Sequence, residues 1–319
     1  MKGPMLKGKK ILVPLDGSEM AEAALPAAVH LSGRLNARVT LFHVIEKDAP
    51  GEVHGQRHLR APEEAEAYLE EVSIRFAREA EASGAESRVD LHVHAAQAEN
   101  VAASIVEHAV EMGCGLIIMC SHGRGRALHL LFGSIAQKVI ARGGIPVLII
   151  RPEPGGGAPG FSCRTLLLPL DGNPEHEQAI PVAAELAEVC GSVLHMAVAV
   201  PEFETLSGQS ALASRFLPGT MSQVLEMSVQ DAEKYVSGLL EGIGRRGVDA
   251  RAHVLRGDPA AAMVALARRV KAGLIVMATH GKKSAMDAFW DGNVPHKISS
   301  LSRVPLLLVP VKKGPPGGK

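Results

Sequence analysis

Apolar and polar positions alternate in blocks along the first half of the chain, and the blocks predict strands separated by helices. Residues 11–15 form a short, continuous apolar run, which is typical of a strand buried on both faces. The same reasoning predicts further strands at 39–45, 87–94, 116–120 and 147–150, and helices at 18–31, 62–81, 100–111 and 134–141. This alternation predicts a parallel sheet with helices on both faces.

The second half of the chain repeats the first. ILVPLDG at 11–17 recurs as LLLPLDG at 166–172, GLIIMCSHG at 115–123 as GLIVMATHG at 273–281, and IPVLII at 145–150 as VPLLLV at 304–309. Three ordered matches at nearly constant offsets of 155, 158 and 159 residues indicate duplication of a whole domain. We therefore predict domains at 1–151 and 162–312, joined by a Pro/Gly-rich linker at 152–161 and followed by a tail at 313–319.

Composition narrows the class of protein. With 46% hydrophobic residues the chain can bury a core, which excludes a disordered chain. Its 34 basic and 34 acidic side chains argue against binding to nucleic acid or to an anionic membrane. No apolar run approaches the ~20 residues of a membrane span, and no signal peptide is visible. The four cysteines have no zinc-ligand spacing, so we expect reduced thiols in a cytoplasmic protein.

Two strand ends carry residues that suit a ligand. Asp16 ends the first strand and Gly123 follows the fourth, so the two converge on one crevice if these strands are neighbours. Gly133 and Ser134 open a helix, whose N–H groups and dipole favour a phosphate. Arg124 adds positive charge. The segment predicts a phosphate site without a Walker motif.

These residues resemble the universal stress protein family in its tandem two-domain form, over almost all of residues 8–311. The motif of the nucleotide-binding branch is G-x2-G-x9-G-[S/T]. Gly123, nine residues, Gly133 and Ser134 match its later part, whereas Cys120 occupies the position of its first glycine. The resemblance implies two doubly wound, Rossmann-like domains of the adenine nucleotide alpha hydrolase type, each with a five-stranded parallel sheet.

The resemblance also implies a ligand and its contacts. Asp16 would meet the ribose or adenine, Val44 the adenine through its backbone, and the two glycines and Ser134 the phosphates. The ligand expected is ATP, with ADP or AMP as alternatives and Mg²⁺ as a companion. The predicted site in the first domain comprises Pro14, Asp16, Val44, Cys120, His122, Gly123, Arg124, Gly133, Ser134 and Ile135.

The second domain matches the motif less well. Ten residues rather than nine separate its glycines, and Asn293 replaces the Ser/Thr. Asp287 and Asp291 bring negative charge toward a phosphate site. The corresponding residues are Pro169, Asp171, Val198, Ala278, Gly281, Gly292 and Asn293.

The function expected is that of a nucleotide-dependent regulator in a stress response. A nucleotide-free interaction scaffold and a weak ATPase are the alternatives, and no catalytic residue is assigned because no acid–base dyad or activated nucleophile is visible. His92 and His94 share a strand face, but no third ligand accompanies them, so no metal is predicted. Cys120 is interpreted as a buried small residue rather than a redox-sensitive thiol.

The last strand of each domain is short and apolar, at 147–150 and 306–309. In the family this strand commonly pairs with its counterpart. Without that pairing, each last strand would leave an exposed sheet edge. We therefore expect the two strands to pair within the chain, and we expect two chains to associate as a homodimer.

Overall fold

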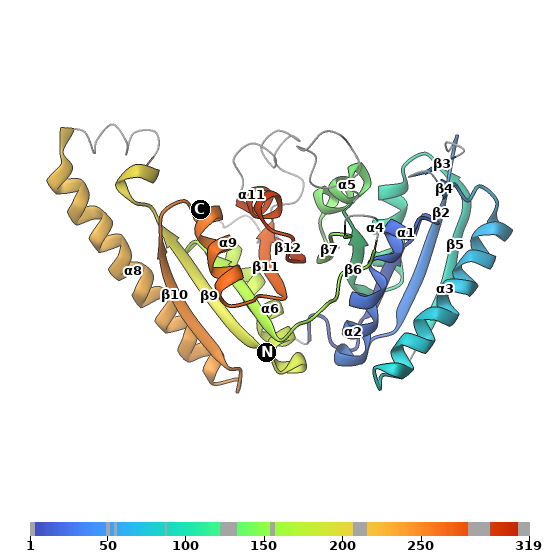
Figure 1. Cartoon of the computed structure of the whole chain (residues 1–319), viewed down its shortest axis with the longest axis horizontal. Helices are drawn as coiled ribbons and strands as arrows, with labels where there is room; N and C mark the ends of the chain where they lie inside the picture. The colour runs from blue at the N-terminus through green and yellow to red at the C-terminus, as the bar shows by residue number, and fades with distance from the viewer. Residues whose placement is uncertain are drawn as a thin grey trace, which may run out of the picture. The chain divides into compact units, whose positions relative to one another are not determined.

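The computed structural model describes residues 4–48, 52–53, 56–86, 88–121, 133–153, 157–206, 216–279 and 294–311. They form two units (Figure 1). The first contains the chain as far as Ser162 and also the segment that starts at Pro305. The second contains Cys163–Thr279 and the segment that ends at Val304.

The sheet of the first unit is parallel. Its strands are β1 (Lys10–Pro14), β2 (Val39–Glu46), β5 (Val89–Ala98), β6 (Cys114–Cys120) and β7 (Val147–Ile150). They lie in the order β5-β2-β1-β6-β7, and each of these pairs is parallel. The five strands predicted from the sequence are all present. A small antiparallel hairpin, β3 (Glu52–Val53) with β4 (Gln56–Arg57), was not predicted.

Helices cover both faces of this sheet. They are α1 (Glu19–Glu22), α2 (Leu25–Leu35), α3 (Pro62–Ala82), α4 (Val101–Glu111) and α5 (Ser134–Arg142). α2 packs on α3 over β1, β2 and β5, whereas α4 packs on α5 and contacts β2, β5 and β6. Ile11, Leu12 and Val13 of β1 are consequently at most 1% exposed, which accounts for the unbroken apolar run.

The helix predicted over 18–31 is two helices. α1 ends at Glu22, and α2 begins at Leu25 with Pro26 in its first turn. Proline lacks a backbone N–H and is tolerated at the start of a helix but not in its interior. The proline therefore accounts for the break between α1 and α2. The Ala-rich sequence had favoured one continuous helix.

The second unit repeats the winding of the first. Its strands are β8 (Thr165–Leu170), β9 (Val193–Val200), β10 (Ala250–Arg256) and β11 (Leu274–Thr279). They lie in the order β10-β9-β8-β11 and pair in parallel, and β12 (Leu306–Pro310) follows β11 in the strand order. The helical segments are η1 (His176–Gln178), α6 (Ala179–Cys190), η2 (Phe203–Thr205), α8 (Pro218–Gly244), α9 (Pro259–Arg269) and α11 (Val294–Leu301). The predicted α/β fold, used twice, is confirmed.

β12, the last strand of the chain, groups with the first unit, where it pairs antiparallel with β7. Leu307 lies opposite Leu148, and both are buried. This confirms the predicted pairing of the two last strands within one chain. The pairing covers an apolar strand edge, which would otherwise be open to association. No helix in the described ranges is both long and apolar enough to cross a membrane.

We expect the core beneath α3 to be sensitive to truncation. Phe76 is 1% exposed, so Phe76→Ala should lower the free energy of unfolding by about 3–5 kcal/mol, measured by urea denaturation. Ile74 on the same helix is 53% exposed, and Ile74→Ala should change it by less than about 0.5 kcal/mol. Equal effects of the two changes would contradict this packing.

Candidate functional site

The strand order of the first unit reverses between β1 and β6. The chain leaves β1 toward α1 and α2, and it leaves β6 toward α5, which lies on the other face. β1 and β6 are neighbours, as the sequence argument required. In open α/β sheets this switch point, at the carboxyl ends of the strands, is where ligands bind.

Asp16 is held at the end of β1 by the turn that follows it. Its Oδ1 accepts hydrogen bonds from the Ser18 backbone N–H at 3.0 Å and from Ser18 Oγ at 2.6 Å. Ser18 is also the N-cap of α1, because its Oγ accepts from the N–H of Ala21 at 3.2 Å. One buried hydroxyl therefore fixes both the carboxylate and the start of the helix.

Gly17 makes this turn possible. Its φ of +85° is one that residues with a side chain rarely adopt. Leu59 also lies against it, since a Cβ placed on Gly17 would approach Leu59 Cγ to 3.0 Å. Leu59 lies two residues after β4, so the segment that follows the unpredicted β3–β4 hairpin contacts the turn at the site.

His43 of β2 supports the same strand end. Its Nδ1 donates to the carbonyl oxygen of Leu15 at 2.7 Å, since a carbonyl can only accept. Burial lowers the pKa of His43, with the nearby His58 acting in the same direction. A buried imidazole that is tethered to the backbone and has a lowered pKa is a structural residue.

Three further predicted residues lie on strands around Asp16. Pro14 ends β1 and is half-buried, and Val44 of β2 is 7% exposed. Cys120 ends β6 and is 2% exposed, and its Sγ donates to the carbonyl oxygen of Ala21 at 3.7 Å. Burial first, and then the charge of Asp16, raise the pKa of Cys120 well above its usual range. Cys120 is therefore a buried, protonated thiol, as predicted.

The amino end of α5 suits an anion. Gly133 is its N-cap in extended conformation, and among the described residues no side chain caps the helix. Its first turn has no acidic residue, Ser134 is exposed, and Ile135 is half-buried. The first N–H groups of a helix have no partner within it, and the helix dipole attracts negative charge there. His122, Gly123 and Arg124, also predicted for this site, lie outside the described residues.

The corresponding carboxylate of the second unit is held differently. Asp171 accepts from the Asn173 N–H at 3.0 Å through Oδ1 and contacts His176 Nδ1 at 2.7 Å through Oδ2. Pro169 lies in β8, Ala278 lies in the neighbouring β11, and Val198 of β9 pairs with Leu170. Both carboxylate oxygens of Asp171 are thus engaged by its own loop. Gly281, Gly292 and Asn293 lie outside the described residues.

Comparison with known proteins identifies the family. The sequence model of the universal stress protein family matches residues 8–151 and again 163–310. The chain belongs to the universal stress protein family. The double match supports the tandem form that the sequence repeat indicated.

Individual relatives agree with this assignment. Universal stress protein YxiE of Bacillus subtilis is 31% identical over 148 residues, which is 44% of this chain and 98% of the relative. Universal stress protein Mb2028c of Mycobacterium bovis is 24% identical over 305 residues, covering 93% of this chain and 96% of the relative. The crystal structure of a universal stress protein from Archaeoglobus fulgidus has a TM-score of 0.63 at 17% identity, with 96% and 98% of the two chains covered. It therefore shares the fold.

The structure of this universal stress protein also contains a histidine cluster that the sequence analysis missed. His92 and His94 of β5 do share a face, and His108 of α4 joins them, with ring centroids at 5.1 and 4.8 Å. Burial lowers the pKa of His92, and so do the neighbouring His108 and His94. In the second unit His195 Nδ1 lies 2.8 Å from His253 Nε2. Only strand–helix and strand–strand packing brings these rings together.

We expect Ser18→Ala to destabilise the first unit by about 1 kcal/mol, because it removes the N-cap of α1. Ser18→Thr, which keeps a hydroxyl, should cost less. Chemical denaturation of both variants measures the difference. Equal stability of the alanine variant and the parent would show that the cap contributes nothing.

We also expect stability to fall as the pH is lowered below about 6.5. The pKa values of His43, His92, His195 and His253 are all lowered, chiefly by burial. Once the pH falls below the pKa that these histidines have in the unfolded chain, the unfolded chain therefore binds more protons than the folded chain. Urea midpoints at decreasing pH test this, and His253→Gln should make the decline shallower. A urea midpoint that rose on acidification would contradict the predicted loss of stability.

Proposed function

We propose that the first unit binds ATP at the switch point between β1 and β6, and that the protein acts as a nucleotide-dependent regulator in a stress response. The observation that carries the proposal is the pairing of two features. A carboxylate is fixed at the end of β1 by neutral donors, and the amino end of α5 has no side-chain cap. These suit a ribose hydroxyl and a phosphate, respectively.

The contacts follow the motif of the family. Asp16, with Pro14 and the backbone of Val44, would hold the ribose and adenine. The N–H groups at Gly133, Ser134 and Ile135 would hold the phosphates, together with the sequence-predicted His122, Gly123 and Arg124. The described residues fit such a ligand, because Val44 supplies a buried apolar contact and the first turn of α5 has no acidic residue. ADP and AMP present the same adenosine, and Mg²⁺ would accompany ATP.

The first unit is the better site on electrostatic grounds. Asp16 accepts from a backbone N–H and a hydroxyl, neither of which carries charge. Asp171 contacts His176, and a ligand would have to displace that imidazole. In the described part of the chain we therefore place nucleotide binding in the first unit and propose at most a weaker site in the second.

The place of action that we propose is the cytoplasm. The four cysteines are thiols in the structure, and that compartment keeps them reduced. The homodimer, and the lack of affinity for nucleic acid, stay predictions from the sequence. Sedimentation of the purified chain tests the homodimer.

Calorimetric titration with ATP, ADP and AMP tests the proposal. We expect one ATP per chain, bound in the first unit. Absence of heat, together with absence of nucleotide in the purified protein, would favour the nucleotide-free scaffold. Phosphate release above background that Asp16→Ala removes would favour the weak ATPase.

Matched variants locate the site. Ser134→Asp places a negative charge in the first turn of α5, which helps the helix but repels a phosphate, so ATP affinity should fall at least ~10-fold while stability is kept. Asp16→Ala should also weaken binding, whereas Asp171→Ala, its counterpart in the second unit, should not. The reverse ranking of the two aspartates would place the nucleotide in the second unit.

A further inference from the structure

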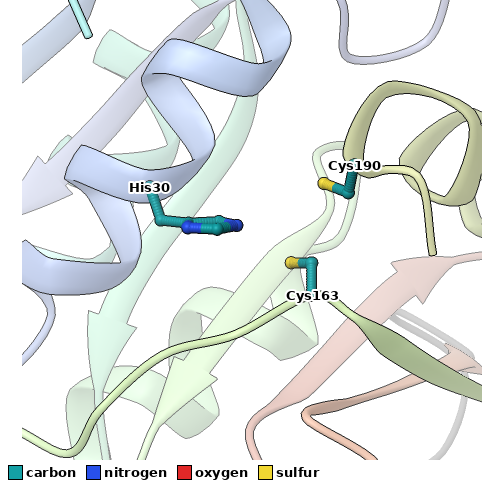
Figure 2. A group of neighbouring side chains, drawn as sticks. All are labelled: His30, Cys163 and Cys190. Atoms are coloured by element: carbon teal, nitrogen blue, oxygen red, sulfur yellow. The ribbon is translucent and has the colours of Figure 1, made fainter. Parts of the chain in front are cut away.

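Two cysteines of the second unit lie side by side. The Sγ atoms of Cys163 and Cys190 are within 4.8 Å of each other, and both residues are thiols. Figure 2 shows Cys163 in the segment before β8 and Cys190 at the end of α6, with both sulfur atoms turned toward the same side. Twenty-six residues separate them in the sequence, so the fold rather than local spacing brings them together.

The backbone around this pair is fixed by hydrogen bonds. The Val193 N–H donates to the carbonyl oxygen of Arg164 at 3.0 Å, and Ser192 Oγ donates to that of Cys163. Thr165 pairs in register with Val193. The chain just after Cys190 therefore runs beside the chain at Cys163, at the spacing of adjacent strands, about 4.8 Å. A disulfide needs the sulfurs about 2.0 Å apart, so the two Sγ atoms, already within 4.8 Å, have to be brought together by rotation of their side chains.

We propose that Cys163 and Cys190 are a reversible dithiol–disulfide pair, oxidised by hydrogen peroxide. Their unequal exposure assigns the roles. Cys190 is partly exposed and meets the oxidant, whereas Cys163 is 1% exposed and resolves the product. Cytosolic disulfides of this kind are usually transient and redox-sensing. The pair lies at the amino end of β8, whereas Asp171 follows its carboxyl end, so this activity is separate from nucleotide binding.

The oxidation balances in two steps. The Cys190 thiolate attacks one peroxide oxygen, the O–O bond breaks, and hydroxide leaves, which gives a sulfenic acid. Cys163 then loses its proton, and its sulfur attacks the Cys190 sulfur and displaces hydroxide, which gives the disulfide. The two thiols lose two electrons and two protons, and the peroxide becomes two water molecules. A reduced dithiol reverses the reaction by exchange.

The other two cysteines differ from this pair. Burial raises the pKa of Cys114 to about 11, and burial also raises that of Cys120. Cys120 donates to the carbonyl oxygen of Ala21 in the first unit. Among the described residues, neither belongs to the cluster of neighbouring cysteine and histidine side chains that contains Cys163 and Cys190. The oxidation is therefore selective for one pair of the four thiols.

Thiol counting and peptide mapping test the proposal. After treatment with a chelator and then peroxide, the thiol count of the denatured chain should fall from four to two and return to four with a dithiol reductant. Trypsin cleaves after Arg164, which separates Cys163 from the peptide 165–215 that contains Cys190. These two peptides should be joined in the oxidised, non-reduced digest. Four surviving thiols, or a link to Cys114 or Cys120, would overturn the proposal.

Variants separate the two roles. Cys163→Ser should halt oxidation at the Cys190 sulfenic acid, which a 1,3-dicarbonyl reagent captures. Cys190→Ser should lose no thiol to a disulfide, and Cys114→Ser, the matched control, should still form the link. Disulfide formation in either Cys163→Ser or Cys190→Ser would show that a different cysteine is the partner, and it would overturn the proposal. The mapping of the parent chain does not depend on how well these variants fold.

Discussion

Parallel pairing of β1 with β6 is the interaction on which the site of the first unit depends. Parallel strands place their carboxyl ends at one edge of the sheet, and the burial of both faces of β1 requires helices above and below it. The winding must then reverse somewhere, and it reverses between these two strands. Cys120 consequently ends β6 beside the turn after β1 that holds Asp16, and the charge of Asp16 adds to burial in raising the pKa of Cys120.

The two units show how one fold supports unequal sites. Both units contain the sequence Pro-Leu-Asp-Gly, in which Asp-Gly follows the end of the strand, and the neighbours of the two strands are equivalent. The difference lies in the turn after it. Ser18 both binds Asp16 and caps α1, whereas Asp171 is bound by Asn173 and His176. The Ser18 hydroxyl and backbone N–H that bind Asp16 are uncharged, whereas the imidazole of His176 competes with any ligand for an oxygen of Asp171.

Much of the fold could be predicted from local pattern. The strand at 147–150 and the start of α5 at Ser134 were placed correctly, and the helix predicted from residue 18 begins at its N-cap Ser18. These features depend on residues within a few positions of one another, such as hydrophobic period and capping chemistry. The Ala-rich composition nevertheless hid the break between α1 and α2, because one proline changes the backbone without changing the apolar pattern.

The amino-acid sequence thus established the alternation of strands and helices and the family motif, which depend on short-range spacing. It also established the duplication, which a direct match between segments of the two halves reveals. Contacts between residues far apart in the sequence are seen only in the tertiary structure. His108 joins His92 and His94 because α4 packs on β5, and Cys163 meets Cys190 because β8 and β9 pair in one particular register. Strand register and helix packing are set by burial summed over a whole domain, which no local pattern records.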